Sequence, residues 1–199
     1  MRAVLSLHYL PNVLWMRHLL KGNAIIDVHE HFVKQTYRNR TSILSANGPL
    51  ALTIPVIKTA HKMPIHELKP DNTIHWQRQH WQSLKSAYGS APYFIHYADA
   101  FENLFTTNTT NLLQFEIDLL KLCIKYLKVD VQLNFSETYI NCLSDDIDLR
   151  QHITPKVIPK EIFKPYLQIF AEKFAFEPNL SIIDLLFNQG PRSIDYINN

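Results

Sequence analysis

The chain has 199 residues, of which 46% are apolar and 19% charged, and these values are typical of one globular domain with a well-formed core. Its 20 basic and 18 acidic side chains nearly balance, which disfavours a generic nucleic-acid binder because such proteins carry a basic patch. The four glycines, Gly22, Gly48, Gly89 and Gly190, are widely separated. That separation excludes the glycine-rich phosphate loops of dinucleotide-binding and P-loop proteins.

The cysteines and the apolar runs indicate where the protein resides. Cys123 and Cys142 form neither a disulfide framework nor a CxxC pair, which is typical of a reducing compartment. The N-terminal apolar stretch is too short for a secretory signal and is broken by His8 and Pro11. No run reaches the roughly 18 apolar residues of a transmembrane helix. We predict a cytoplasmic protein without membrane insertion, folded as a single domain over residues 1–199.

The N-terminal part of the chain predicts a strand–helix–strand unit. Residues 3–7 are a short apolar run that predicts a strand ending at His8. Apolar residues at helical spacing follow between Pro11 and Gly22. Proline suits the first turn of a helix and glycine suits its end, so a helix is predicted between them. Residues 24–28 predict a second strand. Units of this kind build parallel sheets.

Further strands are expected before the chain becomes helical. Residues 43–56 predict two or three strands, with a turn at Asn47 and Gly48. Pro49 and Pro55 indicate that at least one of these strands lies at a sheet edge, because proline cannot donate to a ladder.

The middle of the chain predicts three helices. The first is capped within residues 71–73 and ended by Gly89, and the second begins at Ser90. The third covers residues 111–128, whose apolar side chains recur every three or four positions. The alternating segment 129–135 predicts a strand.

The C-terminal third begins with a polar, proline-containing segment, 136–165, that is expected to be irregular. A short helix follows, capped by Asn179 or by Ser181, which has capping-box spacing to Asp184, and it ends at Gly190. The predicted fold class is therefore α/β, with a mixed, partly parallel sheet flanked by helices.

The segment 34–40 is a candidate anion site. If it is extended, Lys34, Thr36, Arg38 and Arg40 share one face, because side chains alternate along a strand. Cations and a hydroxyl on one face can bind phosphate or carboxylate, with arginine forming a bidentate fork. The alternative is an edge strand made basic to prevent aggregation.

Histidines supply further candidates. Asp27, His29 and His31 would share one face of a strand, and a carboxylate with two histidines can bind a metal. Because spacing indicates no further ligand, we expect no metal site. His80 follows Trp76 by one helical turn and is either an acid–base residue or a hydrogen-bonded histidine in an aromatic cluster. His8 lies at the end of the first strand, where ligands of open α/β sheets bind.

Covalent catalysis is disfavoured, because there is no GxSxG motif and neither cysteine has an activating partner. Asp184 is a candidate catalytic carboxylate, although helix capping also accounts for it. The aromatic segment 93–105 is expected to belong to the core, with a sugar-binding floor as the alternative.

Four motifs resemble the WbqC-like family. They are HYLP at residues 8–11, KQTYRNR at 34–40, HW at 80–81 with YGSAPYF at 88–94, and PNLSIIDLLFNQGP at 178–191. Their order and spacing resemble the family over nearly the whole chain, and this variant is similar to short, Bacteroidetes-type bacterial members. The resemblance implies a place in the synthesis of O-antigen and other surface polysaccharides.

The resemblance also implies which residues form the site. The substrate-binding residues would be Lys34, Tyr37, Arg38, Asn39, Arg40 and Asn179, and the catalytic ones His8, His80 and Asp184. The family site does not require His29 or His31, which further disfavours a metal. Longer members carry a glycine-containing segment where this chain has 136–165, so a nucleotide-handling step that depends on it would be altered here.

Two hypotheses follow. The first is a transferase that acts on an anionic or activated-sugar small molecule, uses neither metal nor covalent nucleophile, and binds no nucleic acid. It leaves the cofactor and the oligomeric state open. The second is a non-catalytic binding or partner module that uses residues 93–105 as its interface and therefore requires an exposed apolar patch there.

Overall fold

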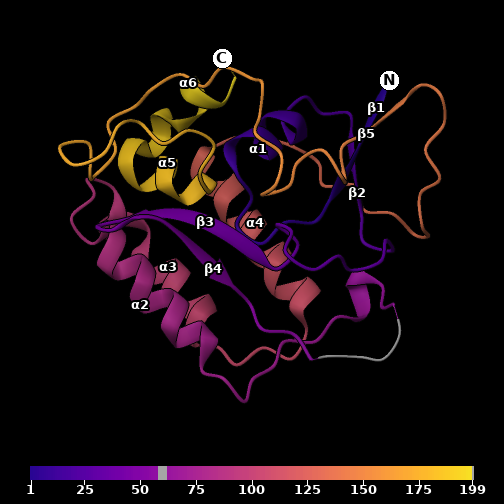
Figure 1. The fold of residues 1–199 in the computed structure, drawn as a ribbon, viewed down its shortest axis with the longest axis horizontal. Coiled ribbons are helices and arrows are strands. Elements are labelled where there is room, and N and C mark those ends of the chain that lie inside the picture. The colour runs from indigo at the N-terminus through magenta and orange to yellow at the C-terminus, as the bar shows by residue number, and fades with distance from the viewer. Residues whose placement is uncertain (58–61, 199) are drawn as a thin grey trace.

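The computed structural model describes residues 1–57 and 62–198. Its first layer is a sheet with strand order β2-β1-β5, formed by β1 (Arg2–Ser6), β2 (Ala24–Asp27) and β5 (Asp146–Asp148) (Figure 1). Both neighbours run parallel to β1. The predicted parallel unit is thus confirmed, and its third strand comes from within the segment expected to be irregular.

Helix α1 (Val13–Leu19) connects β1 to β2. Its N-terminus is capped by Asn12, whose side chain accepts a hydrogen bond from the Trp15 amide at 2.9 Å. Trp15 and Met16 are buried beside the sheet, so the helical spacing of apolar residues is used as predicted. Gly22 follows the helix with φ +78°, a conformation that favours glycine.

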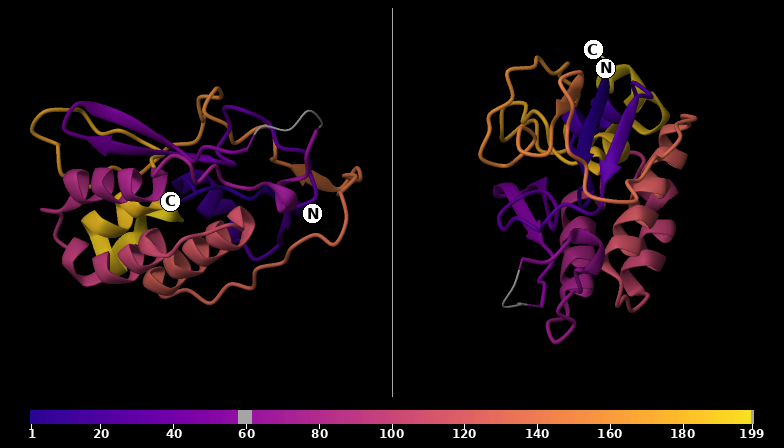
Figure 2. Two further views of the ribbon diagram at one scale, coloured as in Figure 1. Left: turned by 90° about the horizontal axis from the view of Figure 1, so that it is seen from below. Right: turned by 90° about the vertical axis from the view of Figure 1, so that its right-hand side faces the viewer.

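A second, two-stranded sheet is a hairpin of β3 (Arg40–Ser45) and β4 (Gly48–Thr53). The turn falls at Ala46 and Asn47, as predicted to within one residue. Both strands are edge strands, which accommodates Pro49. In Figures 1 and 2 the hairpin lies against the first long helix, with which β3 is in contact.

The helices form the remainder of the fold. The fold class is mixed α/β, as predicted, with a parallel sheet and a small antiparallel hairpin. The elements outside the sheets are η1 (Ile65–Glu67), α2 (Trp76–Tyr88), α3 (Phe94–Thr106), α4 (Leu112–Leu127), α5 (Ile182–Gln189), η2 (Gly190–Ser193) and α6 (Ile194–Ile197). None of the helices within the described ranges is both long and apolar enough to cross a membrane.

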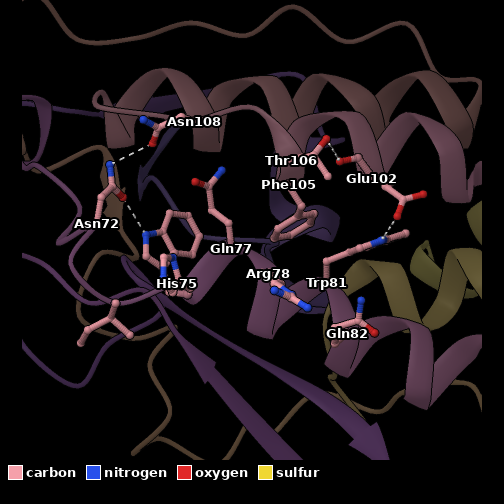
Figure 3. Close-up of a pocket in the computed structure, with 12 residues that line it drawn as sticks. Asn72, His75, Gln77, Arg78, Trp81, Gln82, Glu102, Phe105, Thr106 and Asn108 are labelled. Carbon is pink, nitrogen blue, oxygen red and sulfur yellow. Dashed lines mark hydrogen bonds between the residues drawn. The ribbon is translucent and has the colours of Figure 1, made fainter.

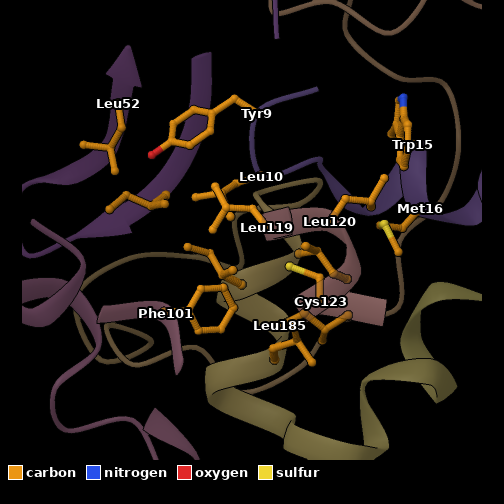
Figure 4. Packing of buried hydrophobic residues seen from close by; sticks show 14 of the residues in the cluster. Tyr9, Leu10, Trp15, Met16, Leu52, Phe101, Leu119, Leu120, Cys123 and Leu185 are labelled. Atoms are coloured by element: carbon orange, nitrogen blue, oxygen red, sulfur yellow. The ribbon is translucent and has the colours of Figure 1, made fainter. Parts of the chain in front are cut away.

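One core joins the sheet to the helices. Figure 4 shows Leu10 and Tyr9 after β1 packed above α4 residues such as Leu119 and Cys123, with Leu185 of α5 beneath them. Burial raises the pKa of the Cys123 thiol to about 12, so this cysteine is inert at neutral pH.

The C-terminal motif is attached directly to the segment after β1. Ser181 Oγ and Thr41 Oγ1 both donate to the Leu10 carbonyl, at 2.9 and 2.8 Å. The Ile182 amide donates to the Pro11 carbonyl at 2.8 Å. Leu10 has φ +45°, which is uncommon for a leucine. These bonds hold the turn that follows β1 in a fixed conformation.

Four predictions of element bounds were wrong, and one of them is the start of the second helix, which begins at Phe94 and not at Ser90. Residues 34–39 are not extended, since Gln35 has φ +59° and only Arg40 enters β3. The segment 129–135 is not a strand, because only Phe135 forms a bridge, to Ile26. Helix α2 begins at Trp76 after an N-cap, His75, that makes no side-chain capping bond.

Candidate functional site

The carboxyl ends of β1, β2 and β5 meet at one edge of the sheet, and they carry a buried ion-pair network. Arg150 Nη1 donates to Asp27 Oδ2 at 2.6 Å, and its Nε and Nη2 donate to Asp148 at 2.9 and 2.7 Å. Ser136 Oγ also donates to Asp27, at 3.0 Å. Asp27 is therefore committed to the fold and is not available as a metal ligand.

A second buried ion pair lies beside the first. Arg38 Nε and Nη2 donate to the two carboxylate oxygens of Glu30 at 3.0 and 2.6 Å, and Nη2 also donates to the Arg150 carbonyl at 3.2 Å. The Arg38 side chain is only 1% exposed, yet its Nη1 has no acceptor among the described residues. The N–H groups of Arg38 Nη1 are therefore free to donate hydrogen bonds.

His8 faces this arginine. Its ring lies 5.4 Å from the ring of Tyr37 and 5.8 Å from that of Trp15, measured between centroids. Within the described chain no group pairs with His8 Nδ1. Burial, and secondarily the charge of Arg38, hold the pKa of His8 well below its usual value, so the imidazole is neutral at pH 7.

Asn12 and Tyr37 complete this side of the site. The Asn12 side-chain oxygen caps α1, whereas its buried Nδ2 lies near the Tyr37 hydroxyl but forms no hydrogen bond of good geometry within the part of the chain that the structure describes. Tyr37 is half-buried, and burial raises the pKa of its hydroxyl, with the amide of Asn12 and the charge of Arg40 acting in the opposite direction.

Tyr9 points to the opposite side of the chain, as successive residues of an extended segment do. Its hydroxyl lies 2.9 Å from His80 Nδ1, and the His80 ring lies 5.4 Å from that of Trp76. Burial lowers the pKa of His80 to about 4, with a hydrogen bond to the Thr53 main chain acting in the opposite direction. His80 is thus a neutral, hydrogen-bonded histidine within an aromatic cluster.

Glu116 of α4 is close enough to Tyr9 for its charge to affect the Tyr9 hydroxyl. Its side chain is buried, and neither carboxylate oxygen has a hydrogen-bond partner in residues 1–57 or 62–198. Burial raises the pKa of Glu116 well above its usual value. Burial therefore favours the neutral acid of Glu116 over its carboxylate.

We call these eight residues the β1 polar cluster, because they surround the residues that follow β1. The cluster comprises His8, Tyr9, Asn12, Glu30, Tyr37, Arg38, His80 and Glu116. All the buried side-chain atoms without a partner in the described chain belong to it. Buried polar groups are almost always paired in proteins, so this concentration makes the β1 polar cluster the candidate site.

Glu116→Gln tests the protonation state of that carboxyl. Because glutamine mimics the neutral acid, the variant is expected to gain stability relative to the parent as pH rises above the usual carboxyl pKa, by at most about 1.4 kcal/mol per pH unit. The sign follows because a raised folded-state pKa makes the parent lose stability as pH rises above that value. Urea unfolding measures the difference, with exposed Glu172→Gln as the control. A pH-independent difference would mean that Glu116 is charged in the folded protein.

His80→Gln tests the histidine. The folded-state pKa of about 4 lies below the usual 6.5, so the unfolded chain binds a proton that the folded chain does not. The parent is therefore expected to lose about 2 kcal/mol between pH 6.5 and 5 through this residue, and the variant to lack that part of the slope. Equal slopes of unfolding free energy against pH in parent and variant would contradict the assignment.

A surface pocket of about 410 Å³ lies between α2 and α3 (Figure 3). Its wall combines aromatic edges with amides and charges, including Trp76, Gln77, Arg78 and Asn108. Figure 3 also shows Trp81 donating to Glu102, at 2.7 Å. Trp76 lines this pocket and also contacts His80. The indole ring of Trp76 therefore lies between the pocket and the Tyr9 side of the β1 polar cluster.

Several residues predicted for the site lie elsewhere or are used by the fold. Lys34 is exposed. Asn39 Nδ2 donates to the Ile54 carbonyl at 2.7 Å, and Arg40 Nε donates to Thr53 Oγ1 at 3.0 Å. Asn179 Oδ1 accepts from the Leu14 amide at 2.8 Å. The structure brings together His8, Tyr37 and Arg38. His80 lies apart from these three residues, against Tyr9.

Asp184 does not form the predicted capping box. Its carboxylate accepts from Tyr88 Oη at 2.8 Å, from Tyr166 Oη at 2.7 Å and from Gln168 Nε2 at 3.3 Å. The cap is made by Ser181 alone, whose side chain accepts from the Ile183 amide. Burial raises the pKa of Asp184, although these donors act in the opposite direction. The carboxylate ties the segment around Tyr166 to α2 and α5.

The aromatic segment 93–105 is turned inward, as its core assignment predicted. Phe94, Tyr97, Phe101 and Phe105 are buried, whereas Ile95 is exposed. The exposed apolar patch that a partner module would need is therefore not formed by this segment. Helical periodicity places these rings on the face that packs on α2 and α4.

The sequence contained one signal for Glu116 that the prediction did not use. Glu116 falls within the apolar stripe of α4, between Leu112 and Leu120, and a carboxylate at such a position is buried when the helix packs. Glu30 and Arg150 gave no comparable signal, because Glu30 is paired across a turn-rich loop of eight residues and Arg150 is paired with Asp27 in a distant segment.

Comparisons with known proteins identify relatives of the chain. The model of a family described as the WbqC-like protein family matches residues 8–154 and 149–196. An uncharacterised protein of Mycobacterium tuberculosis (strain ATCC 25618 / H37Rv), Rv1507c, is 26% identical over an alignment of 196 positions. The alignment covers 83% of this chain and 83% of the relative. No solved structure matches the chain significantly.

Proposed function

The chain belongs to the WbqC-like protein family, and we propose that it is an enzyme of bacterial surface-polysaccharide biosynthesis that transfers a group on an anionic or activated-sugar substrate. The observation that carries this proposal is the set of buried, unpartnered polar atoms around the end of β1: His8 Nδ1, Asn12 Nδ2, Arg38 Nη1 and the Glu116 carboxyl oxygens, none of which pairs with any described residue. Carboxyl ends of parallel strands are where open α/β sheets bind ligands.

The two sides of the cluster have different chemistry. On the His8 side, Arg38 Nη1 and Asn12 Nδ2 are donors that suit a phosphate or carboxylate oxygen. His8 is neutral there, so it can accept a proton from a hydroxyl or amine nucleophile. Half-buried Tyr37 covers this side, and its displacement would admit the substrate.

On the Tyr9 side, Glu116 supplies a proton in our proposal. A carboxyl whose pKa is raised by burial can act as general acid toward a leaving group. Tyr9 and His80 are hydrogen-bonded to each other and form the wall between Glu116 and Trp76. The α2–α3 pocket beyond Trp76 offers amides and an arginine to the sugar part of a substrate.

A thermal-shift screen tests the proposal. The full chain is titrated with inorganic phosphate, pyrophosphate, nucleotide sugars, acyl-CoA and a neutral hexose. A ligand at about 100 times its dissociation constant stabilises by about 2.7 kcal/mol, which is about 5–10 °C for a protein of this size. We expect a shift with an anionic compound and none with the hexose alone. If every anionic compound leaves the midpoint unchanged, the proposal fails.

A further inference from the structure

Exposed apolar side chains concentrate in the segment that connects α4 to α5. Seven of the thirteen large apolar residues that are exposed in the described chain lie within residues 136–167. The extreme cases are Ile158, Ile162 and Leu167, which are 88%, 87% and 75% exposed. Scattered surface apolar residues are ordinary, but such a concentration in one short stretch marks an interaction surface.

This exposure does not result from a loose chain, because the segment is attached at several points. Arg17 Nη2 donates to the Ile162 carbonyl at 3.4 Å, and the Arg17 guanidinium lies 5.2 Å from the Phe163 ring centre. Tyr166 is bonded to Asp184 at 2.7 Å. Phe163 and Tyr166 therefore pack toward the protein, whereas Ile158 and Ile162 point to solvent. Figure 2 shows the segment along the outside of the molecule.

Lysines alternate with these aliphatic residues. Lys156 and Lys160 are exposed and, within the described ranges, form no ion pair with a carboxylate, whereas Lys164 Nζ donates to the Asp195 carbonyl at 3.4 Å and lies 4.9 Å from the centre of the Tyr196 ring. Glu161 is the one acidic residue of the stretch 156–167, and it lies close enough to His18 to influence the pKa of that imidazole. The outward surface thus combines aliphatic side chains with a positive charge.

We infer that residues 156–167 dock the protein on the surface of an anionic phospholipid bilayer. Ile158, Ile162 and Leu167 would enter the boundary between headgroups and acyl chains, while the lysines contact lipid phosphates. A second copy of this chain is a poorer occupant, because a two-fold contact would bring two positively charged segments into one interface. An apolar protein partner would leave the ammonium groups of Lys156 and Lys160 without counter-charges.

Vesicle flotation tests the inference. The full chain is mixed with vesicles of phosphatidylcholine alone, or with about one-third phosphatidylglycerol, at low salt and again at high salt. We expect flotation with the anionic vesicles only, and its loss as salt screens the lysines. Ile158→Ser with Ile162→Ser should reduce binding about tenfold or more, because two inserted side chains are removed. Ile95→Ser is the matched control, since Ile95 is 78% exposed on α3, and it should bind like the parent.

Three results would overturn the inference. The first is equal binding to neutral and anionic vesicles. The second is no flotation with either composition. The third is a dimer in light scattering that the double serine variant converts to a monomer, because the exposed segment would then be a contact between copies. Circular dichroism of each variant confirms that its fold is retained.

Discussion

Arg38→Met should destabilise the protein by about 3 kcal/mol at pH 7 and by about 1 kcal/mol at pH 5. The arginine is the sole bidentate partner of Glu30 among the described residues, and both side chains are buried. Without it, Glu30 must lose its charge on folding, since a buried carboxylate without a partner takes up a proton. That protonation becomes easier as pH falls toward the usual carboxyl pKa, so the loss shrinks at acidic pH.

Chemical denaturation at the two pH values measures both losses. The double variant Arg38→Met with Glu30→Met serves as the control, because it removes both charges and keeps apolar volume. It should recover most of the stability at pH 7. An equal loss at pH 5 and pH 7 would show that packing, and not the orphaned carboxylate, accounts for the effect.

Asp184→Ala should destabilise the protein by about 3–5 kcal/mol. The carboxylate accepts from Tyr88, Tyr166 and Gln168, so alanine leaves buried donors unpaired as well as a cavity. The segment around Tyr166 also has no strand or helix of its own and depends on this attachment. Its detachment should make the chain between α4 and α5 an early site of proteolysis.

Tyr166→Phe is the matched control for that substitution. It removes one donor and leaves the acceptor with two others, so the expected loss is about 1 kcal/mol. Thermal unfolding and limited trypsin digestion of the two variants provide the comparison. If Asp184→Ala unfolds like the parent but abolishes ligand-dependent stabilisation, Asp184 acts in the site and its structural role is minor.

Capping residues and apolar periodicity predicted those helices and strands whose bounds are set by neighbouring residues. Helix α4 begins where it was predicted, and Asn111 caps it, because its side-chain oxygen accepts from the Gln114 amide three residues later. The apolar spacing of α4 gave its length to within a residue at each end. The first strand–helix–strand unit was predictable for the same reason. Each of its elements has its own apolar periodicity, and Gly22 marks the end of the helix.

The site was predictable only in part, because its pairings run through irregular loops or between distant segments. Arg38 was singled out for its charge, but its partner Glu30 lies eight residues earlier in a loop without periodicity, and its neighbour Arg150 lies 112 residues later. The choice of a strand for 34–40 failed because the bond from Arg38 to Glu30 favours a turn-rich path over an extended one. Glu116 was missed because the apolar stripe of α4 was taken from its aliphatic residues alone.

The most direct test of the account compares Arg38→Lys with Arg150→Lys in the presence of the anionic compound that stabilises the parent. Both substitutions keep the charge and the ion pair, but only Arg38 has a terminal nitrogen without an acceptor in the described chain. We predict that Arg38→Lys loses most of the thermal shift produced by that ligand and that Arg150→Lys retains it. Equal ligand-induced shifts in the two variants would contradict the assignment of the β1 polar cluster as the binding site.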